Sequence, residues 1–200
     1  MRLRANGNLS ANLWFAAWIF AAAAGTAAFH WSMSTPGRAS ASPVSIDRPG
    51  RTTVLYFAHP HCQCSTATIG ELAGRAEAGE ADITVVITGP AADVPGWRES
   101  ANAAAALRHG ALHVTHDPEG AIAERFGALT SGHTVIYDDE GQLVFSGGLT
   151  SARGIVGPSR GLDALDRAIS GRAVDVADAP VFGCTIFNHS QSDTTPGTTR

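Results

Sequence analysis

The stretch AHPHCQCSTATIGEL, residues 58–72, joins two runs of different periodicity and determines how the rest of the chain is interpreted. Residues 52–58 (TTVLYFA), which lead into it, are β-branched and aromatic, and this predicts a buried strand. Residues 65–78 carry apolar side chains on one side only, which predicts a helix capped by the hydroxyl residues at its start. Cys62 and Cys64 therefore lie at the end of a strand and just before a helix.

Downstream of residue 51 the chain alternates between predicted strands and predicted helices. The strands are residues 52–58, 82–88, 111–117, 133–137 and 142–146, and the helices are residues 65–78, 97–109, 118–126 and 161–170. Such alternation predicts an α/β fold with a mainly parallel sheet and right-handed crossovers, to which the hairpin of residues 133–146 adds an antiparallel edge. Chemistry in such sheets lies outside the carboxyl ends of the strands, which is where both cysteines lie.

The N-terminal region predicts a membrane segment. Residues 13–29 (LWFAAWIFAAAAGTAAF) carry no charge, and at about 1.5 Å per residue they span roughly 25 Å, the short end of a bilayer crossing. Arg2 and Arg4 precede this segment, and tryptophans lie at its two ends, where aromatic side chains favour the interface. We favour an uncleaved anchor, residues 1–31, over a cleaved signal peptide, for which the small residues near position 24 are also suitable.

Both interpretations place the rest of the chain outside the cytoplasm, because the arginines stay on the cytoplasmic side. The expected location is the inner membrane, with a single span and a C-terminal domain facing the periplasm. Residues 32–50 are rich in Ser, Pro, Ala and Gly and predict a flexible linker. Residues 51–172 are the expected domain, and residues 173–200 are a C-terminal extension that contains Cys184 and ends in a disordered polar tail.

Charge and cysteine content exclude two classes of protein. The chain of 200 residues has a formal net charge of −4 and no block of like charge. This argues against nucleic-acid binding, which needs a basic surface to neutralise phosphates. Three cysteines are too few for a disulfide scaffold, so the chain must rely on a hydrophobic core.

The position of the cysteine pair favours thiol chemistry. A thiolate at a helix N-terminus is stabilised by unpaired N–H groups and by the helix dipole, which lower its pKa. An imidazolium from His59 or His61 would lower it further. Two thiols there supply either two electrons for exchange or two soft ligands for a metal ion. The alternatives without chemistry are a structural disulfide, inert buried thiols, or a tethered interaction domain with a vestigial site.

A strand, then cysteines, then a helix, and later TSGHTVIYDDEGQLVFSGG (130–148), resemble the thioredoxin-like superfamily over about residues 51–172. More narrowly, HPHCQCS (59–65), TSARG (150–154) and PVFGC (180–184) resemble the membrane-anchored RedB-type group. The resemblance implies a thioredoxin-like three-layer α/β sandwich, a mixed sheet with helices on both faces, preceded by one N-terminal transmembrane helix. It also implies a thiol–disulfide oxidoreductase without a cofactor, which acts on protein thiols or disulfides with Cys62 as nucleophile and Cys64 as resolving thiol.

Two positions depart from the superfamily's pattern. Its usual motif is Cys-x-x-Cys, but Ser65 stands where the second cysteine would be. Its cis-proline corresponds to His133, so we expect a trans peptide there and an imidazole that points towards the cysteines. Copper-handling proteins of the Sco type share this fold and hold metal with two cysteines and one histidine from the same places. This second resemblance implies an alternative function, copper binding or delivery by Cys62, Cys64 and His133.

The remaining cysteine and the loop histidines keep several roles open. A tetrahedral zinc site would need a fourth ligand, from His59, His61 or Cys184. An unpaired thiol in an oxidising compartment tends to find a partner. Cys184 could therefore resolve a mixed disulfide on Cys62, complete a metal site, or be a buried hydrophobic residue.

Overall fold

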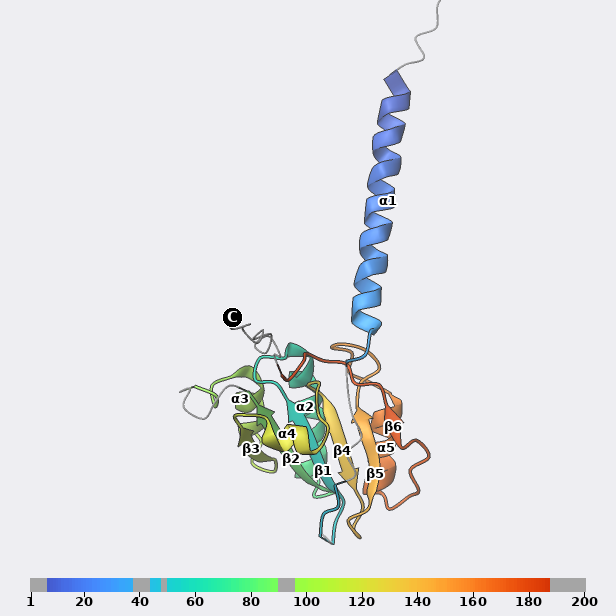
Figure 1. The fold of residues 1–200 in the computed structure, drawn as a ribbon. Helices are drawn as coiled ribbons and strands as arrows, with labels where there is room; N and C mark the ends of the chain where they lie inside the picture. The colour runs from blue at the N-terminus through green and yellow to red at the C-terminus, as the bar shows by residue number, and fades with distance from the viewer. Residues whose placement is uncertain (1–6, 38–43, 48–49, 90–95, 188–200) are drawn as a thin grey trace, which may run out of the picture. The chain divides into compact units, whose positions relative to one another are not determined.

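A mixed six-stranded sheet lies at the centre of the domain in the computed structural model, which describes residues 7–37, 44–47, 50–89 and 96–187 (Figure 1). The strands are β1 (Thr53–Ala58), β2 (Asp82–Thr88), β3 (His113–Asp117), β4 (His133–Tyr137), β5 (Leu143–Gly148) and β6 (Asp178–Ala179). Their order is β3-β2-β1-β4-β5-β6. β1, β2 and β3 are parallel, β4 is antiparallel to β1 and β5, and β6 is parallel to β5. The carboxyl end of β1, inside the sheet, leads directly into the cysteine loop.

Helices cover both faces of the sheet (Figure 1). They are α2 (Gln63–Glu77), α3 (Ala101–Leu107), α4 (Ala121–Arg125) and α5 (Arg160–Ile169). α2, α3 and α5 pack on one face through the first hydrophobic cluster, and α4 packs on the other through the second. The domain is therefore the thioredoxin-like three-layer sandwich with a mixed sheet that the sequence predicts.

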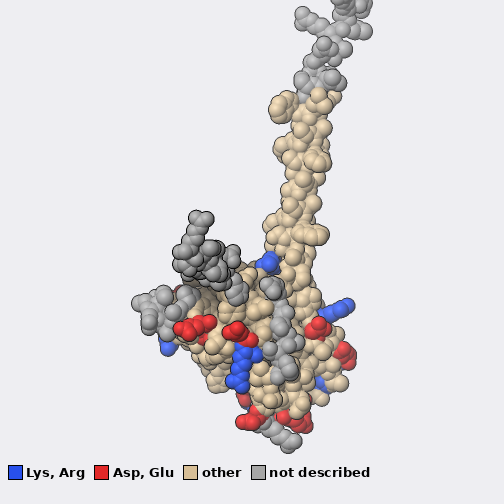
Figure 2. All heavy atoms as spheres, viewed as in Figure 1, with Lys and Arg blue, Asp and Glu red and all other residues tan. Residues whose placement is uncertain are grey.

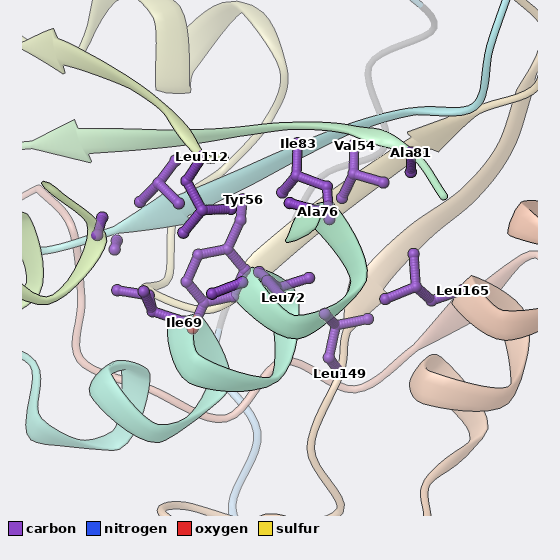
Figure 3. Close-up of a cluster of buried hydrophobic side chains, with 14 of the residues drawn as sticks. Val54, Tyr56, Ile69, Leu72, Ala76, Ala81, Ile83, Leu112, Leu149 and Leu165 are labelled. Carbon is purple, nitrogen blue, oxygen red and sulfur yellow. The ribbon is translucent and has the colours of Figure 1, made fainter. Parts of the chain in front are cut away.

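Alternate residues of β1 supply the two hydrophobic clusters. Tyr56 points into the first cluster, where it meets Ile69 and Leu72 of α2 (Figure 3). Leu165 of α5 lies farther along the same cluster, beside Leu149. Phe57 belongs to the second cluster, on the α4 face. Ile69 and Leu72 have no exposed surface, so the burial of each contributes about 1.5–3 kcal/mol to the free energy of folding. This packing holds α2, and with it the cysteine loop, on the sheet.

The hairpin of β4 and β5 lies inside the sheet, so the prediction of an antiparallel edge is wrong. β4 pairs with β1, and β5 pairs with β6, which leaves β3 and β6 as the edges of the described sheet. The sequence does not reveal β6 because Asp178–Ala179 is too short to show an alternating pattern.

Three helices begin two to four residues away from their predicted starts. α2 begins at Gln63, because Cys62 is its N-cap with an extended backbone (φ −77°, ψ 101°). α3 begins at Ala101 rather than at residue 97, because Ser100 is an extended N-cap (φ −60°, ψ 149°). α4 begins after Gly120, whose φ of 79° interrupts a helix that was expected from residue 118.

The C-terminal extension is part of the domain. Residues 179–181 approach the backbone of β5 so closely that a Cβ atom at Gly147 or Gly148 would overlap them. The two glycines therefore permit β6 to pair with β5 and direct the following residues towards the cysteine loop.

The predicted linker also contacts the domain in the part that the structure describes. The hydroxyl of Tyr137 donates to the carbonyl oxygen of Val44 (2.7 Å), and Val44 and Ile46 pack against the second cluster. Val44 and Ile46 therefore pack on the domain, whereas the sequence predicts a flexible linker for this segment. The predicted disordered tail, residues 188–200, lies outside the described residues.

Helix α1 (Gly7–Ser34) belongs to a separate compact unit, residues 1–35. Its segment Ala11–Ser34 is long and apolar enough to cross a membrane. It contains no Asp, Glu, Lys or Arg and is drawn entirely in tan in Figure 2. A signal sequence near an N-terminus has the same properties, so the choice between an anchor and a signal peptide stays a prediction.

Candidate thiol site

Cys62 ends the loop between β1 and α2 and caps the helix. Its N–H donates to the carbonyl oxygen of His59 (3.1 Å), and its own carbonyl oxygen accepts from the N–H of Ser65 (3.0 Å). Cys62 has 0% exposure, whereas Cys64, in the first turn of α2, is partly exposed. The buried thiol thus lies at the N-terminus of a helix of 15 residues, where the helix dipole favours an anion.

Asn102, near the start of α3, fastens this loop from the side. Its side-chain amide donates to the carbonyl oxygens of His59 (2.8 Å) and Cys62 (2.9 Å), and its Oδ1 accepts from the hydroxyl of Thr66 (2.8 Å). Asn102 has 0% exposure. A buried amide with three such partners fixes the position of the Cys62 backbone. Sequence reasoning missed this residue, although a single polar side chain in the alanine-rich run ANAAAAL was a usable signal.

Cys184 reaches the site on an extended segment, residues 181–187, which we call the strap. The strap pairs antiparallel with residues 129–131 through an isolated bridge between Thr130 and Thr185. The N–H of Ser131 donates to the carbonyl oxygen of Cys184 (2.8 Å), and the backbone N–H of Cys184 donates to the Sγ atom of Cys62 (3.4 Å). The fold therefore brings the third cysteine against the first, across 122 residues of sequence.

Hydroxyl groups complete the surroundings of Cys62. The Oγ atoms of Ser65 and Ser131 share a hydrogen bond (2.8 Å), and the Oγ of Ser131 accepts from the N–H of His59 (2.9 Å). Both serines are buried. Ser65, which stands where the second cysteine of Cys-x-x-Cys would be, thus supplies a hydroxyl to the thiol site.

The surroundings make Cys62 the most acidic of the three thiols. Burial raises the pKa of Cys62, but hydrogen bonds from the backbone and thiol of Cys184 and from the hydroxyls of Ser131 and Ser65 lower it by more. Its pKa therefore lies below the ordinary value. Burial and the charge on Cys62 raise the pKa of Cys64. Burial and a hydrogen bond with Cys62 raise the pKa of Cys184 to about 11. The site thus combines one thiol whose surroundings favour the thiolate with two thiols whose surroundings favour the protonated form.

Arg153 contacts the strap and acts electrostatically on the thiols of Cys64 and Cys184. Its guanidinium donates to the carbonyl oxygen of Gly183, and its charge opposes the rise in the pKa of both Cys64 and Cys184. The sequence gives Arg153 only as part of the TSARG motif, because its contact with Gly183, 30 positions away, exists only in the folded chain.

The loop histidines lie where they were predicted, but they interact with each other. The N–H of His61 donates to the Nδ1 atom of His59 (3.2 Å), and the two ring centroids are 6.2 Å apart. Burial and His61 lower the pKa of His59, which favours its neutral ring. Backbone, hydroxyl and thiol donors therefore stabilise Cys62 where the sequence suggested an imidazolium.

His133 faces away from the cysteines, so the predicted orientation of its imidazole is wrong. Its Nε2 lies 2.9 Å from the Oγ of Ser146, and its ring packs edge-on against Phe57 at 6.4 Å. It shares the strand face of Val135, which belongs to the second cluster, on the opposite side of the sheet from α2. Burial lowers the pKa of His133 to about 4. The peptide before His133 is trans, as predicted.

The donor set proposed for copper does not converge. Among the described residues, one group of three or more His, Cys, Asp or Glu side chains has its ligand atoms mutually within 4.8 Å, and it is Asp138, Asp139 and Glu140 in the hairpin turn. Neither Cys62, Cys64 and His133 nor the three cysteines form such a group in this part of the chain. The residues present therefore do not fit a preformed soft-metal site.

No protein-family model matches the sequence, and no curated protein is similar to it. Among solved structures, a hypothetical protein, SMc02350, from Sinorhizobium meliloti 1021 is 22% identical with a TM-score of 0.57, covering 76% of this chain and 93% of its own. An uncharacterized conserved protein from Geobacillus kaustophilus is 21% identical with a TM-score of 0.57, covering 79% and 95%. A secreted Mycobacterium tuberculosis disulfide oxidoreductase homologous to E. coli DsbE is 19% identical, covering 62% and 84%, with a TM-score of 0.44. The first two likenesses concern the fold alone, and the third carries no inference about activity.

Proposed function

We propose that the chain is an extracytoplasmic thiol–disulfide oxidoreductase in which Cys62 is the nucleophile. The observation that carries this proposal is the environment of Cys62, a buried thiol at a helix N-terminus that accepts a hydrogen bond from the strap and lies beside a hydrogen-bonded pair of serine hydroxyls. An inert structural cysteine behaves as a hydrophobic residue and needs no such donors. Thiolate is the reactive form in exchange, and donors that favour it prepare the sulfur for attack.

The reaction needs only the thiols of the site. The Cys62 thiolate attacks a substrate disulfide, a bond forms between its Sγ and one substrate sulfur, and the other substrate sulfur leaves as a thiolate. A second thiol of the site then attacks Cys62 and releases the first substrate sulfur, so two electrons pass to the substrate. The resemblance implies Cys64 for this second step, and Cys184 also forms hydrogen bonds with the reacting sulfur.

The arrangement of the motifs supports the narrower proposal that the chain is of the RedB type. The HPHCQCS loop, Ser131 and the PVFGC segment come from distant parts of the sequence and meet around the sulfur of Cys62. Arg153 of the TSARG motif contacts the PVFGC segment at Gly183. We further propose that α1 anchors the protein in the inner membrane with the domain in the periplasm, where thiols and disulfides exchange.

The geometry of the site does not favour the copper alternative. It requires the imidazole of His133 beside two sulfurs, and that imidazole lies on the other face of the sheet. Thiol exchange uses the same cysteines without this histidine.

The test is disulfide reduction by the full-length protein in detergent micelles, with insulin as a disulfide-bonded substrate and a dithiol as the electron donor. We expect Cys62→Ser to abolish catalysis. Ser146→Ala, which alters a hydroxyl on the opposite face, is the matched control and should keep full activity. Undiminished turnover by Cys62→Ser would contradict the proposed function.

A further inference from the structure

We propose that the strap occupies the place of a substrate segment and that Cys184 forms the disulfide with Cys62 that completes each reduction. The inference rests on the proposed function and names both the resolving thiol and the class of substrate. That class is an extended protein segment that pairs with residues 129–131 once the strap has moved aside.

The pairing of the strap shows how such a segment would be held. Ser131 and Leu129 exchange backbone hydrogen bonds with Cys184 (2.8 Å) and Ile186 (3.0 Å), the pattern of a strand added to an edge. In this register the N–H of residue 184 donates to the sulfur of Cys62. Any extended peptide in the same register offers the same N–H and C=O groups, and it places its own residue at position 184 against the reactive sulfur.

The strap also explains why Cys62, the proposed nucleophile, is buried. Cys62 has 0% exposure, whereas Cys184, which lies over it, is exposed. A substrate sulfur cannot reach Cys62 while the strap is in place. Opening must disrupt three backbone hydrogen bonds, those of the strap with Ser131, Leu129 and Gly37. It must also disrupt the contact of Arg153 with Gly183 and the burial of Ile186, so the closed form predominates without substrate.

Cys184 is better placed than Cys64 to resolve the mixed disulfide. Cys62 is the extended N-cap of α2, and Cys64 lies only two positions later in the first turn, where its thiol also interacts with Cys62. A bond between them would require the helix start to change. Cys184 arrives on a separate segment that can approach or withdraw as a unit. Once Cys62 is in a mixed disulfide its charge is gone, which removes one cause of the raised pKa of Cys184.

The electrons and protons balance with these groups. Cys184 attacks the Sγ of Cys62, a Cys62–Cys184 bond forms, and the substrate sulfur leaves and takes up the proton that Cys184 loses. The enzyme pair has then lost two electrons to the substrate. A protein dithiol, as the external reductant, restores both thiols.

Gly183 indicates which sequences can pair with residues 129–131. A Cβ atom at this position would overlap the carbonyl oxygen of Ser131. The residue before position 184 must therefore be glycine for the strap to pair with residues 129–131. A substrate in the same register meets the same carbonyl. We therefore expect the pairing site of residues 129–131 to favour substrates with glycine immediately before the reacting cysteine.

The first experiment opens the strap in the full-length protein. Gly183→Ala should raise the rate of Cys62 alkylation about tenfold or more, because local opening governs access to a buried group. Gly110→Ala is the matched control, since a Cβ there meets open space. An unchanged alkylation rate in a folded Gly183→Ala protein would contradict the role of the strap.

The second experiment identifies the resolving thiol and needs no destabilising change. Limited oxidation of the wild-type protein, followed by disulfide mapping, should give Cys62–Cys184. In a single turnover, Cys184→Ser should accumulate the mixed disulfide on Cys62, whereas Cys64→Ser should not. A Cys62–Cys64 bond, or normal turnover by Cys184→Ser, would overturn the inference about Cys184. The proposed function would remain intact, because it fails only if Cys62 itself is dispensable.

The third experiment uses peptides to test the preference for glycine before the reacting cysteine. The disulfide-linked dimers of VFGCTIF, the sequence of the strap, and of VFACTIF are compared as substrates. We expect faster reduction of the glycine peptide by the wild-type protein, and a larger gain for it in Gly183→Ala. Equal rates for the two peptides would contradict pairing in this register.

Discussion

A single hydroxyl group, that of Ser131, connects the cysteine loop to the thiolate. It accepts from the N–H of His59 (2.9 Å), shares a hydrogen bond with Ser65 (2.8 Å), and helps to lower the pKa of Cys62. Ser131→Ala should therefore raise the pKa of Cys62, because one donor to the thiolate is lost. The titration of thiolate absorbance measures this directly, with Ser146→Ala as the control. A Cys62 pKa equal to the wild-type value would show that the hydroxyl does not act on the sulfur.

The histidine that faces away from the site makes stability depend on pH. Burial lowers the pKa of His133 to about 4, whereas the unfolded chain has the ordinary value of about 6.5. Between these values the unfolded state binds more protons, so stability falls as the pH falls through this window. This group alone should remove about 2 kcal/mol of the free energy of unfolding between about pH 7.5 and about pH 5.

Denaturant unfolding at the two pH values measures the loss. His133→Gln does not titrate and should lose less stability on acidification than the wild-type protein. An equal loss in both proteins would mean that other groups account for the pH dependence.

At the scale of elements, the amide of Asn102 joins α3 to the loop before α2. Asn102→Ala removes the side-chain donor from two carbonyl oxygens, those of His59 and Cys62, each of which keeps only its backbone donor, and we expect a loss of about 1–3 kcal/mol in the free energy of unfolding. Thr66→Ala removes only the bond to Oδ1 (2.8 Å) and should cost about 1 kcal/mol or less. Similar losses in the two variants, measured by denaturant unfolding, would contradict the role of the amide as a clamp.

The elements that the sequence predicts are those whose signal is local. The strand–cysteine–helix unit around Cys62 and the hairpin of β4 and β5 follow from periodicity and turn residues within a few positions. Strand pairing is not local, so the interior place of the hairpin and the two-residue strand β6 could not be predicted.

The same division holds within the thiol site. The cysteine pair and its helix could be identified from their spacing. The association of Cys62 with Ser131, Asn102 and Cys184 joins residues 40 to 122 positions apart and exists only in the folded chain. The orientation of His133 depends on which face of the sheet α2 covers, which no pattern near residue 133 contains.

For the molecule as a whole, the N-terminal helix decides where the chemistry takes place. Acidic and basic side chains are interspersed on the face of the domain seen in Figure 2. If α1 is an anchor, the protein should remain with the membrane after carbonate washing and require detergent for release, and its intact mass should include residues 1–31. A mature chain that begins near residue 28 would instead identify a signal peptide.

The closed strap has a consequence for the lifetime of the protein under oxidative stress. A stabilised thiolate is also the form that peroxide oxidises, first to sulfenic acid and then irreversibly to sulfinic acid. Cys62 is shielded from such small oxidants by the segment that carries Cys184, and a sulfenic acid formed there would meet a neighbouring thiol and condense to a reversible disulfide. After peroxide exposure, intact-mass analysis should find two added oxygen atoms on Cys62 in Gly183→Ala and in Cys184→Ser, but not in the wild-type protein. Sulfinic acid on wild-type Cys62 at the same peroxide dose would show that the strap gives no protection.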